Sequence, residues 1–319
     1  MSGEPIGRPA HQADGLRRLE TPGLDADAAW MRAAVEAFEP RMRELAGRGA
    51  APAAWEEIPG GGCGWTCRCC PPAAARRRLD LDRWSGRLGD RHRSIGRGDH
   101  PLAARLSRSR SRGETVVLGA AADPWGGDAG RRARTRALLA SLVDHEGLEI
   151  AVLTASPLVV CDLDLLVALD AAHSLTVEIS LATVEPSIAR LLSAAAHPPA
   201  EVLAAGGELA AQGLAVRWRL RPLMPGINDG EDGIAALLVA ADAVGAVDVS
   251  ASPLVLPWGG TRRRYFAWLA DARPDLLGDY RRLYRARTRL PVSERSAMLE
   301  SFERLHLAHG FPRPRPGRG

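Results

Sequence analysis

Short apolar runs alternate with longer amphipathic segments through the middle of the chain, between residues 115 and 250. The runs have the length of buried strands, and we expect five of them, at 115–118, 149–153, 176–181, 215–220 and 247–250. The segments between them have helical periodicity, at 130–144, 162–172, 186–193, 200–212 and 231–244. Because strands that alternate with helices pair in parallel through right-handed crossovers, the pattern predicts an α/β fold with a parallel sheet.

Two α/β architectures fit this alternation, a barrel and a doubly wound sheet. No G-x-G-x-x-G segment joins a strand to a helix, so the phosphate loop of dinucleotide-binding sheets is missing from the sequence. A barrel binds ligands at the carboxyl ends of its strands, which suits a cysteine-rich loop that follows a short strand at 55–59. We therefore expect a partial (β/α)6 TIM-like barrel over residues 54–257.

The two ends of the chain are expected to add helices to the barrel. Residues 1–53 are predicted to form an N-terminal appendage with a helix at 25–46. Residues 258–319 are predicted to form a C-terminal helical cap, with helices at 261–272 and 293–309 and a disordered tail rich in proline and arginine. The side chains expected to pack between the cap helices are Tyr265, Phe266, Trp268 and Leu269. A further helix is expected at 101–109, whereas 76–98 has no clear pattern.

Length and composition exclude several classes of protein. The 319 residues are 46% hydrophobic, enough for a sizeable core. Residues 1–18 are polar and lack the apolar core of a signal peptide, and no apolar run reaches the about 18 residues of a membrane span. We therefore expect a cytoplasmic protein with no membrane partner.

The formal net charge is +4, and the sequence contains arginine but no lysine. The segment from Arg76 to Arg112 contains twelve arginines and four aspartates, a local charge of +8. Such a patch could attract nucleic acid. A solvated arginine-rich face is the favoured interpretation, because Trp84 is the only aromatic side chain there that could stack on a base.

Four of the five cysteines lie within eight residues, in the loop from Gly61 to Pro72. Cys63, Cys67 and Cys70 form a C-x3-C-x2-C series. Three thiolates on one short loop can ligate three irons of a [4Fe-4S] cluster, which leaves the fourth iron open to a small molecule. A ferredoxin-like electron carrier would ligate that iron with a fourth cysteine at motif spacing.

Zinc binding, packing and disulfide formation are less consistent with the spacing of these cysteines. Zinc sites usually have two separated ligand pairs, and the adjacent Cys69 and Cys70 would strain tetrahedral binding by both. Cysteines kept for packing are usually scattered. An odd number of cysteines without a secretory context does not favour disulfides. The spacing favours an iron-sulfur site and leaves a structural zinc site as the alternative.

The cysteine loop and the β/α units that follow it resemble the radical S-adenosylmethionine (SAM) superfamily, whose core is a partial, six-unit β/α barrel. The sequence is more similar still to the group related to spore photoproduct lyase, also described as DNA-repair-photolyase-like. The matching segments lie within residues 115–229: Val117-Leu118-Gly119 and Asp123-Pro124-Trp125; Leu153 to Val159 and Asp162 to Leu166; Ile179 to Thr183; and Pro222 to Asp229.

The resemblance implies a specific chemistry. SAM binds the open iron through its amino and carboxylate groups, and one electron from the cluster cleaves its C5′–S bond to give methionine and a 5′-deoxyadenosyl radical, which abstracts hydrogen from an unknown substrate. An external electron donor of the flavodoxin or ferredoxin type is implied as a partner. By matching position, Cys63, Cys67 and Cys70 would be the iron ligands, Ser180 would lie near SAM, and Asp123 is a candidate for the same pocket. For Ser180 and Asp123, a role as strand-end or turn residues is the alternative.

The sequence also departs from its relatives. They commonly carry an aromatic residue before the third cysteine, where this chain has Cys69, and a lysine that meets the SAM carboxylate, where it has Ala155. Arg217, Arg219 and Arg221 alternate along one strand and so share a face. If that face lined the lumen, an arginine could bind the carboxylate. We expect it to face outward, because burying three like charges is costly.

The departures leave two further functional hypotheses. One is a degenerate member that holds a cluster without cleaving SAM, and the other is an arginine-rich nucleic-acid-binding module with a structural metal. We expect no spore photoproduct lyase activity, because residues 120–122 are alanines where that enzyme carries its hydrogen-donating cysteine. Cys161 is expected to be a packed thiol.

Overall fold

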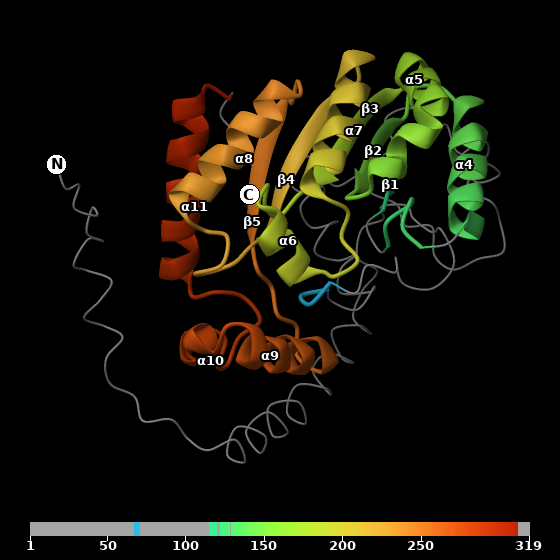
Figure 1. The fold of residues 1–319 in the computed structure, drawn as a ribbon. Coiled ribbons are helices and arrows are strands. Elements are labelled where there is room, and N and C mark those ends of the chain that lie inside the picture. The colour runs from blue at the N-terminus through green and yellow to red at the C-terminus, as the bar shows by residue number, and fades with distance from the viewer. Residues whose placement is uncertain (1–66, 71–114, 120–121, 128, 312–319) are drawn as a thin grey trace. The chain divides into compact units, whose positions relative to one another are not determined.

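A parallel sheet forms the centre of the fold. The computed structural model describes residues 67–70, 115–119, 122–127 and 129–311, which are coloured in Figure 1. Five strands lie side by side in chain order: β1 (Thr115–Leu118), β2 (Glu149–Thr154), β3 (Ser174–Ser180), β4 (Val216–Leu223) and β5 (Asp248–Pro253). A doubly wound sheet would instead reverse its order at a switch point. The barrel-type strand order expected from the sequence is therefore confirmed.

Several sequence-based expectations lie outside the described residues. They are the appendage at 1–53, the strand at 55–59 that would precede β1, the segments at 76–98 and 101–109, the Arg76 to Arg112 patch and the tail after Phe311. Within the described ranges, no helix has both the length and the hydropathy that crossing a membrane requires.

Eight α-helices follow or flank the strands in the part of the chain that the structure describes. They are α4 (Ala129–Val143), α5 (Leu163–Ala172), α6 (Pro186–Leu192), α7 (Pro199–Ala211), α8 (Glu231–Ala243), α9 (Gly260–Ala272), α10 (Leu277–Leu283) and α11 (Val292–His309). All except α10 were expected from the periodicity. Helix α10 is only seven residues long and contains two arginines, so its apolar pattern is too short to detect.

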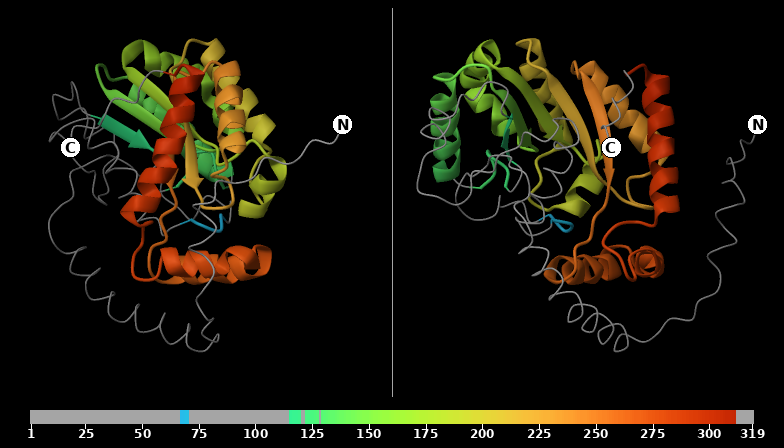
Figure 2. Two further views of the ribbon diagram at one scale, coloured as in Figure 1. Left: turned by 90° about the vertical axis from the view of Figure 1, so that its left-hand side faces the viewer. Right: turned by 180° about the vertical axis from the view of Figure 1, so that it is seen from behind.

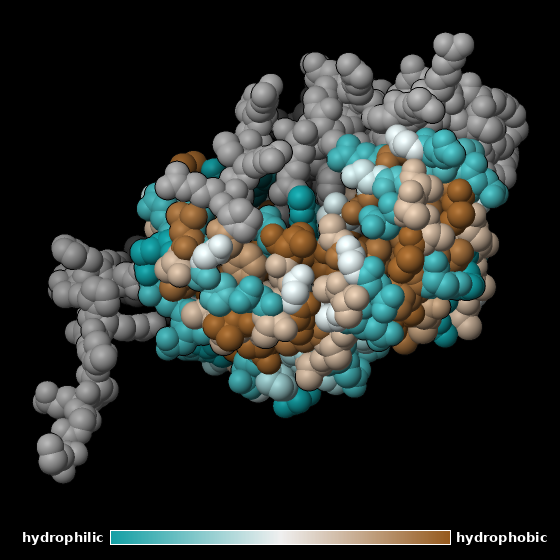
Figure 3. All heavy atoms as spheres, turned by 90° about the horizontal axis from the view of Figure 1, so that it is seen from above, coloured by the Kyte–Doolittle hydropathy of each residue, from teal (hydrophilic) through white to brown (hydrophobic). Residues whose placement is uncertain are grey.

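The two faces of the sheet have opposite character. The outer face carries Val152, Val177 and Trp218, which are fully buried and form the main core together with side chains of the covering helices. Helices α4, α5, α7 and α8 cover this face in Figures 1 and 2. The alternating positions on the inner face are largely polar on β3 and β4, and they include Glu178 and Arg219. Figure 3, seen from the end opposite to α9 and α10, shows hydrophilic and hydrophobic residues mixed over the surface.

The helices after β5 separate into two groups. Helix α11 packs against α8 and β5 and joins the outer layer. Helices α9 and α10 surround a second core that includes Met224 and the three tyrosines of the chain. The aromatic face expected on α9 does pack, but its partner is α10. The ring centroid of Tyr265 lies 5.1 Å from that of Trp268 on the same helix and 5.7 Å from that of Tyr280 on α10.

Helix α7 approaches the sheet closely at one glycine. A Cβ atom added at Gly206 would lie 2.4 Å from Cζ2 of Trp218, whereas one added at the neighbouring Gly207 would meet Val244 at 3.4 Å, at the margin of ordinary contact. The packing of α7 on β4 therefore requires glycine at position 206, whereas position 207 has room for a Cβ atom.

We expect Gly206→Ala to lower the free energy of unfolding by about 1–2 kcal/mol, because the clash with a fully buried ring exceeds the gain in helix propensity. The matched control, Gly207→Ala, should raise it by up to about 1 kcal/mol. Urea unfolding followed by circular dichroism measures both. A Gly206→Ala variant as stable as the wild type would contradict this packing.

Candidate functional site

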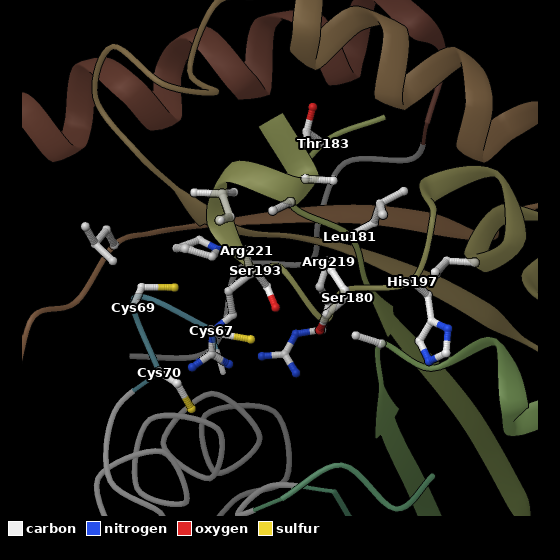
Figure 4. Close-up of a pocket in the computed structure, with 18 of the residues that line it drawn as sticks. Cys67, Cys69, Cys70, Ser180, Leu181, Thr183, Ser193, His197, Arg219 and Arg221 are labelled. Carbon is white, nitrogen blue, oxygen red and sulfur yellow. The ribbon is translucent and has the colours of Figure 1, made fainter. Parts of the chain in front are cut away.

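A cavity lies at the carboxyl ends of the strands, between the sheet and the cysteine loop (Figure 4). Its wall combines the cysteine loop with residues from β2 to β5 and from the segments after β3. The lining residues with polar or sulfur-containing side chains are Cys67, Cys69, Cys70, Thr154, Ser180, Thr183, Ser193, His197, Arg219 and Arg221. Carboxyl ends of parallel strands are where barrels place their ligand groups, as expected from the sequence.

Hydrogen bonds join the cysteine loop to two helices, α6 and α9. The Cys70 N–H donates to the Cys67 carbonyl at 3.1 Å and closes a tight turn. The Arg68 N–H donates to the carbonyl of Leu192 at the end of α6, at 3.1 Å, and the Thr261 hydroxyl at the start of α9 donates to the Cys70 carbonyl at 3.2 Å. The main chain of the loop is therefore bonded to α6 at one residue and to α9 at another.

Two of the three predicted iron ligands line this cavity together. Cys67 and Cys70 both lie on its wall, and Figure 4 shows their side chains beside Arg219 and Arg221. The third, Cys63, lies outside the described residues, and within those residues no group of three histidine, cysteine or carboxylate side chains could hold a metal ion. A thiolate donor set on one tight turn fits an iron-sulfur cluster.

Cys69 differs from its neighbours in its surroundings. Its side chain packs against the second core, beside residues of α9 and α10. Burial, assisted by the nearby Cys67 and Cys70 and opposed by Arg221, raises the pKa of the Cys69 thiol to about 12. Because a ligand must be a thiolate, this burial makes Cys69 poorly suited to bind a metal.

The arginine face of β4 points into the lumen, and the expectation that it faces outward was wrong. Arg219 is only 2% exposed and forms an ion pair with Glu178 on β3, with Nε and Oε2 3.3 Å apart. Arg219 and Arg221 both line the cavity. The cost of burying like charges is offset by Glu178, an acidic side chain on the neighbouring strand. The sequence alone does not show that Glu178 lies beside these arginines.

The two residues expected near SAM have different places. Ser180 is the last residue of β3 and lines the cavity. Asp123 is fully buried and does not line the cavity: its carboxylate accepts hydrogen bonds from the Trp125 N–H at 3.0 Å, the Ala155 N–H at 2.7 Å and the Thr154 hydroxyl at 3.0 Å. These contacts favour the alternative role of Asp123 as a turn residue. Its carboxylate holds Thr154 and Ala155, and both of these residues line the cavity.

Asn228 contributes to the site in a way that the sequence did not reveal. Its Nδ2 donates to the carbonyls of Ala182 at 2.7 Å and Pro222 at 2.9 Å, and its Oδ1 accepts from the Met224 N–H at 2.7 Å. Ala182 and Pro222 both line the cavity. The amide therefore joins the loops that follow β3 and β4, and only the matched segment around Pro225 hinted at its importance.

The remainder of the wall was also not predicted. Ser193 and His197 come from the segment between α6 and α7, and much of the surrounding wall is apolar, including Leu181, Leu192 and Val202. Nothing in the pattern of that segment distinguishes it from an ordinary helix connection. Cys161 lies elsewhere, and it is exposed rather than packed, because the 3-10 helix Pro157–Asp162 turns Val159 and Asp162 inward instead.

Two uncharacterised mycobacterial proteins are similar in sequence to this chain. One is from Mycobacterium tuberculosis (strain H37Rv) and the other from Mycobacterium bovis, and each is 32% identical over 218 residues. The match covers 67% of this chain and 64% of each relative, so the chain spans less than two thirds of the length of these relatives. No protein-family model matches the chain.

Solved structures of spore photoproduct lyase are similar to the fold. A variant with bound AdoMet and dinucleoside spore photoproduct superimposes with a TM-score of 0.54 at 14% identity, covering 80% of this chain and 72% of that one. A second structure, complexed with dinucleoside spore photoproduct, gives a TM-score of 0.51 at 12% identity and the same coverage. The chain therefore has the fold of spore photoproduct lyase, and the resemblance to radical SAM proteins predicted from its sequence is confirmed at the level of the fold.

Proposed function

We propose that this chain is a radical SAM enzyme, in which Cys63, Cys67 and Cys70 hold a [4Fe-4S] cluster and the adjoining cavity binds SAM. The observation that carries the proposal is that Cys67, Cys70, Ser180 and Arg221 line a single cavity at the carboxyl ends of the strands. When bound, the cluster supplies the single electron that cleaves the C5′–S bond of SAM.

The arginines of β4 provide the charge that a SAM carboxylate requires. Arg219 is held by Glu178, while Arg221 lies closer to the end of the strand and near enough to Cys69 for its charge to lower the pKa of that thiol. Ala155 lines the same cavity without contributing a side-chain charge. We infer that Arg221 binds the carboxylate in place of the lysine found in relatives, through charge-assisted hydrogen bonds.

The remaining wall residues would orient SAM and exclude water. The Ser180 hydroxyl can donate to or accept from the polar part of the ligand. Leu181, Leu192 and Leu254 form an apolar wall beside it. A wall of this kind keeps solvent from a reactive radical, and it suits the adenosyl end of the ligand.

Ala155 also supports a second candidate function, a protein that holds the cluster but does not cleave SAM. The two candidates differ in one product. Anaerobic protein reduced with dithionite and incubated with SAM should accumulate 5′-deoxyadenosine if the chain is an enzyme. If SAM stays intact for many hours in protein whose cluster is fully reduced, the result would refute the enzyme and support the second candidate.

We expect Cys67→Ser and Cys70→Ser each to abolish the cluster, because each removes one of only three thiolate ligands. The matched control in the same turn, Cys69→Ser, should keep the wild-type content of iron and sulfide, since the Cys69 side chain packs against the second core and its burial raises the pKa of the thiol. Iron and sulfide assays with electron paramagnetic resonance of the reduced protein distinguish the variants. Loss of iron in all three variants alike, or zinc in the wild type, would contradict the ligand assignment.

We expect Arg221→Ala to weaken SAM binding about tenfold or more, because a charge-assisted hydrogen bond contributes about 1.5–3 kcal/mol. Arg190→Ala removes the same charge from an exposed position on α6 and should leave affinity unchanged. Adding Ala155→Lys to Arg221→Ala should restore part of the affinity by returning a cation to the cavity. Calorimetric titration with SAM measures all four proteins. Unchanged affinity in Arg221→Ala would remove this residue from the binding site.

A further inference from the structure

We propose that the exposed N-terminal turn of α9, together with the cysteine loop, is the docking surface for an acidic electron-transfer protein. We call this surface the α9 patch, and define it by Arg68, Arg263 and Arg264. The inference rests on the proposed function, because its purpose is to deliver one electron from a reduced flavin or iron-sulfur protein to the cluster. The donor loses that electron, the cluster gains it, and no proton or further reactant is needed.

The α9 patch is connected to a predicted iron ligand by a short path. Thr261, in the first turn of α9, donates its hydroxyl to the Cys70 carbonyl at 3.2 Å. The guanidinium of Arg264 lies 3.4 Å from the same hydroxyl. Only one side chain therefore separates the exposed Arg264 from the main chain of Cys70. A donor that contacts this turn would bring its redox centre close to the cluster.

The segment that begins with this turn is strongly positive. Residues 260–290 contain nine arginines and three aspartates, a local charge of +6. Arg273 pairs with Asp275, and Arg282 lies near Asp279. Arg263 and Arg264 are exposed and form no ion pair with any described residue. The positive end of the dipole of α9 adds to their field.

A buried arginine, Arg262, lies next to the two exposed ones and is held by several contacts. The neighbouring Arg262 is 1% exposed, donates to the carbonyls of Leu256 and Arg287, and lies 3.7 Å above the ring of Trp258. These contacts fix the start of α9 relative to the segments before and after it. The exposed face of the helix continues through Ala267 and Ala270, whose small side chains permit close approach of a partner.

An acidic protein fits this surface better than a nucleic acid does. Transient redox complexes use small interfaces and rely on complementary charge for fast, oriented association. Single-stranded nucleic acid instead requires exposed aromatic platforms. Among the described residues the large exposed hydrophobic side chains are all aliphatic, and Phe266 and Trp268 of α9 are half-buried in the second core.

The test compares charge reversal inside and outside the α9 patch in the full-length protein. The test variant is Arg263→Glu with Arg264→Glu. The matched control is Arg132→Glu with Arg134→Glu, which reverses two charges on α4 in the outer layer. Binding of a bacterial flavodoxin is measured by calorimetry at low and high salt. Cluster reduction is followed by loss of visible absorbance, with reduced flavodoxin or with dithionite as the electron source.

We expect the α9 variant to bind flavodoxin at least tenfold more weakly than the wild type and to be reduced by it at least tenfold more slowly. Its reduction by dithionite, a small reductant that needs no docking, should be unchanged, and the α4 variant should match the wild type throughout. Flavodoxin binding that is unaffected in the α9 variant, or weakened equally in both, would overturn the proposal. So would single-stranded DNA that binds the α9 patch while flavodoxin does not bind. Failure of dithionite and SAM to yield 5′-deoxyadenosine would instead refute the proposed function, whereas the binding data would still decide the docking surface.

Discussion

The site depends on the buried ion pair between Arg219 and Glu178. A β-sheet that packs helices on one face can leave its other face polar only if the polar groups there are compensated. Here the compensation comes from adjacent strands, since Glu178 and Arg219 lie on β3 and β4, with Nε and Oε2 3.3 Å apart. This pair keeps charged groups on the inner face and so allows Arg221 to reach the cavity beyond it.

Polar side chains that hydrogen-bond to main-chain groups hold the loops around the cavity. Asp123 binds the turn after β2, Asn228 joins the loops after β3 and β4, and Thr261 holds the cysteine loop. Each contact satisfies main-chain groups that a loop would otherwise leave to solvent. A rigid wall is thus built at the ends of the strands, where a ligand group must be positioned accurately.

The sequence predicted the elements well and the orientation of one strand poorly, for a physical reason. Alternation shows that Arg217, Arg219 and Arg221 share a face, but a strand of this kind has two faces, and the choice between them depends on the neighbouring strand. Glu178 is far away in sequence; the register of β3 with β4 places it opposite Arg217, and its side chain pairs with Arg219, two residues further along the same face. Helix α10 was missed because a seven-residue helix shows too little periodicity.

The cysteine loop and Ala155 show the same limit of prediction from sequence. The spacing of the cysteines suggested which thiols belong together, yet the different surroundings of Cys69 depend on α9 and α10, whose residues lie some two hundred positions later and bury it. Likewise, the missing charge at Ala155 suggested a weakened site, whereas β4, two strands away from β2, supplies an arginine to the same cavity. A binding site requires a charge at a given position in space, and several strands can provide it. In a barrel this exchange needs little structural change, because the carboxyl ends of all the strands converge on one cavity.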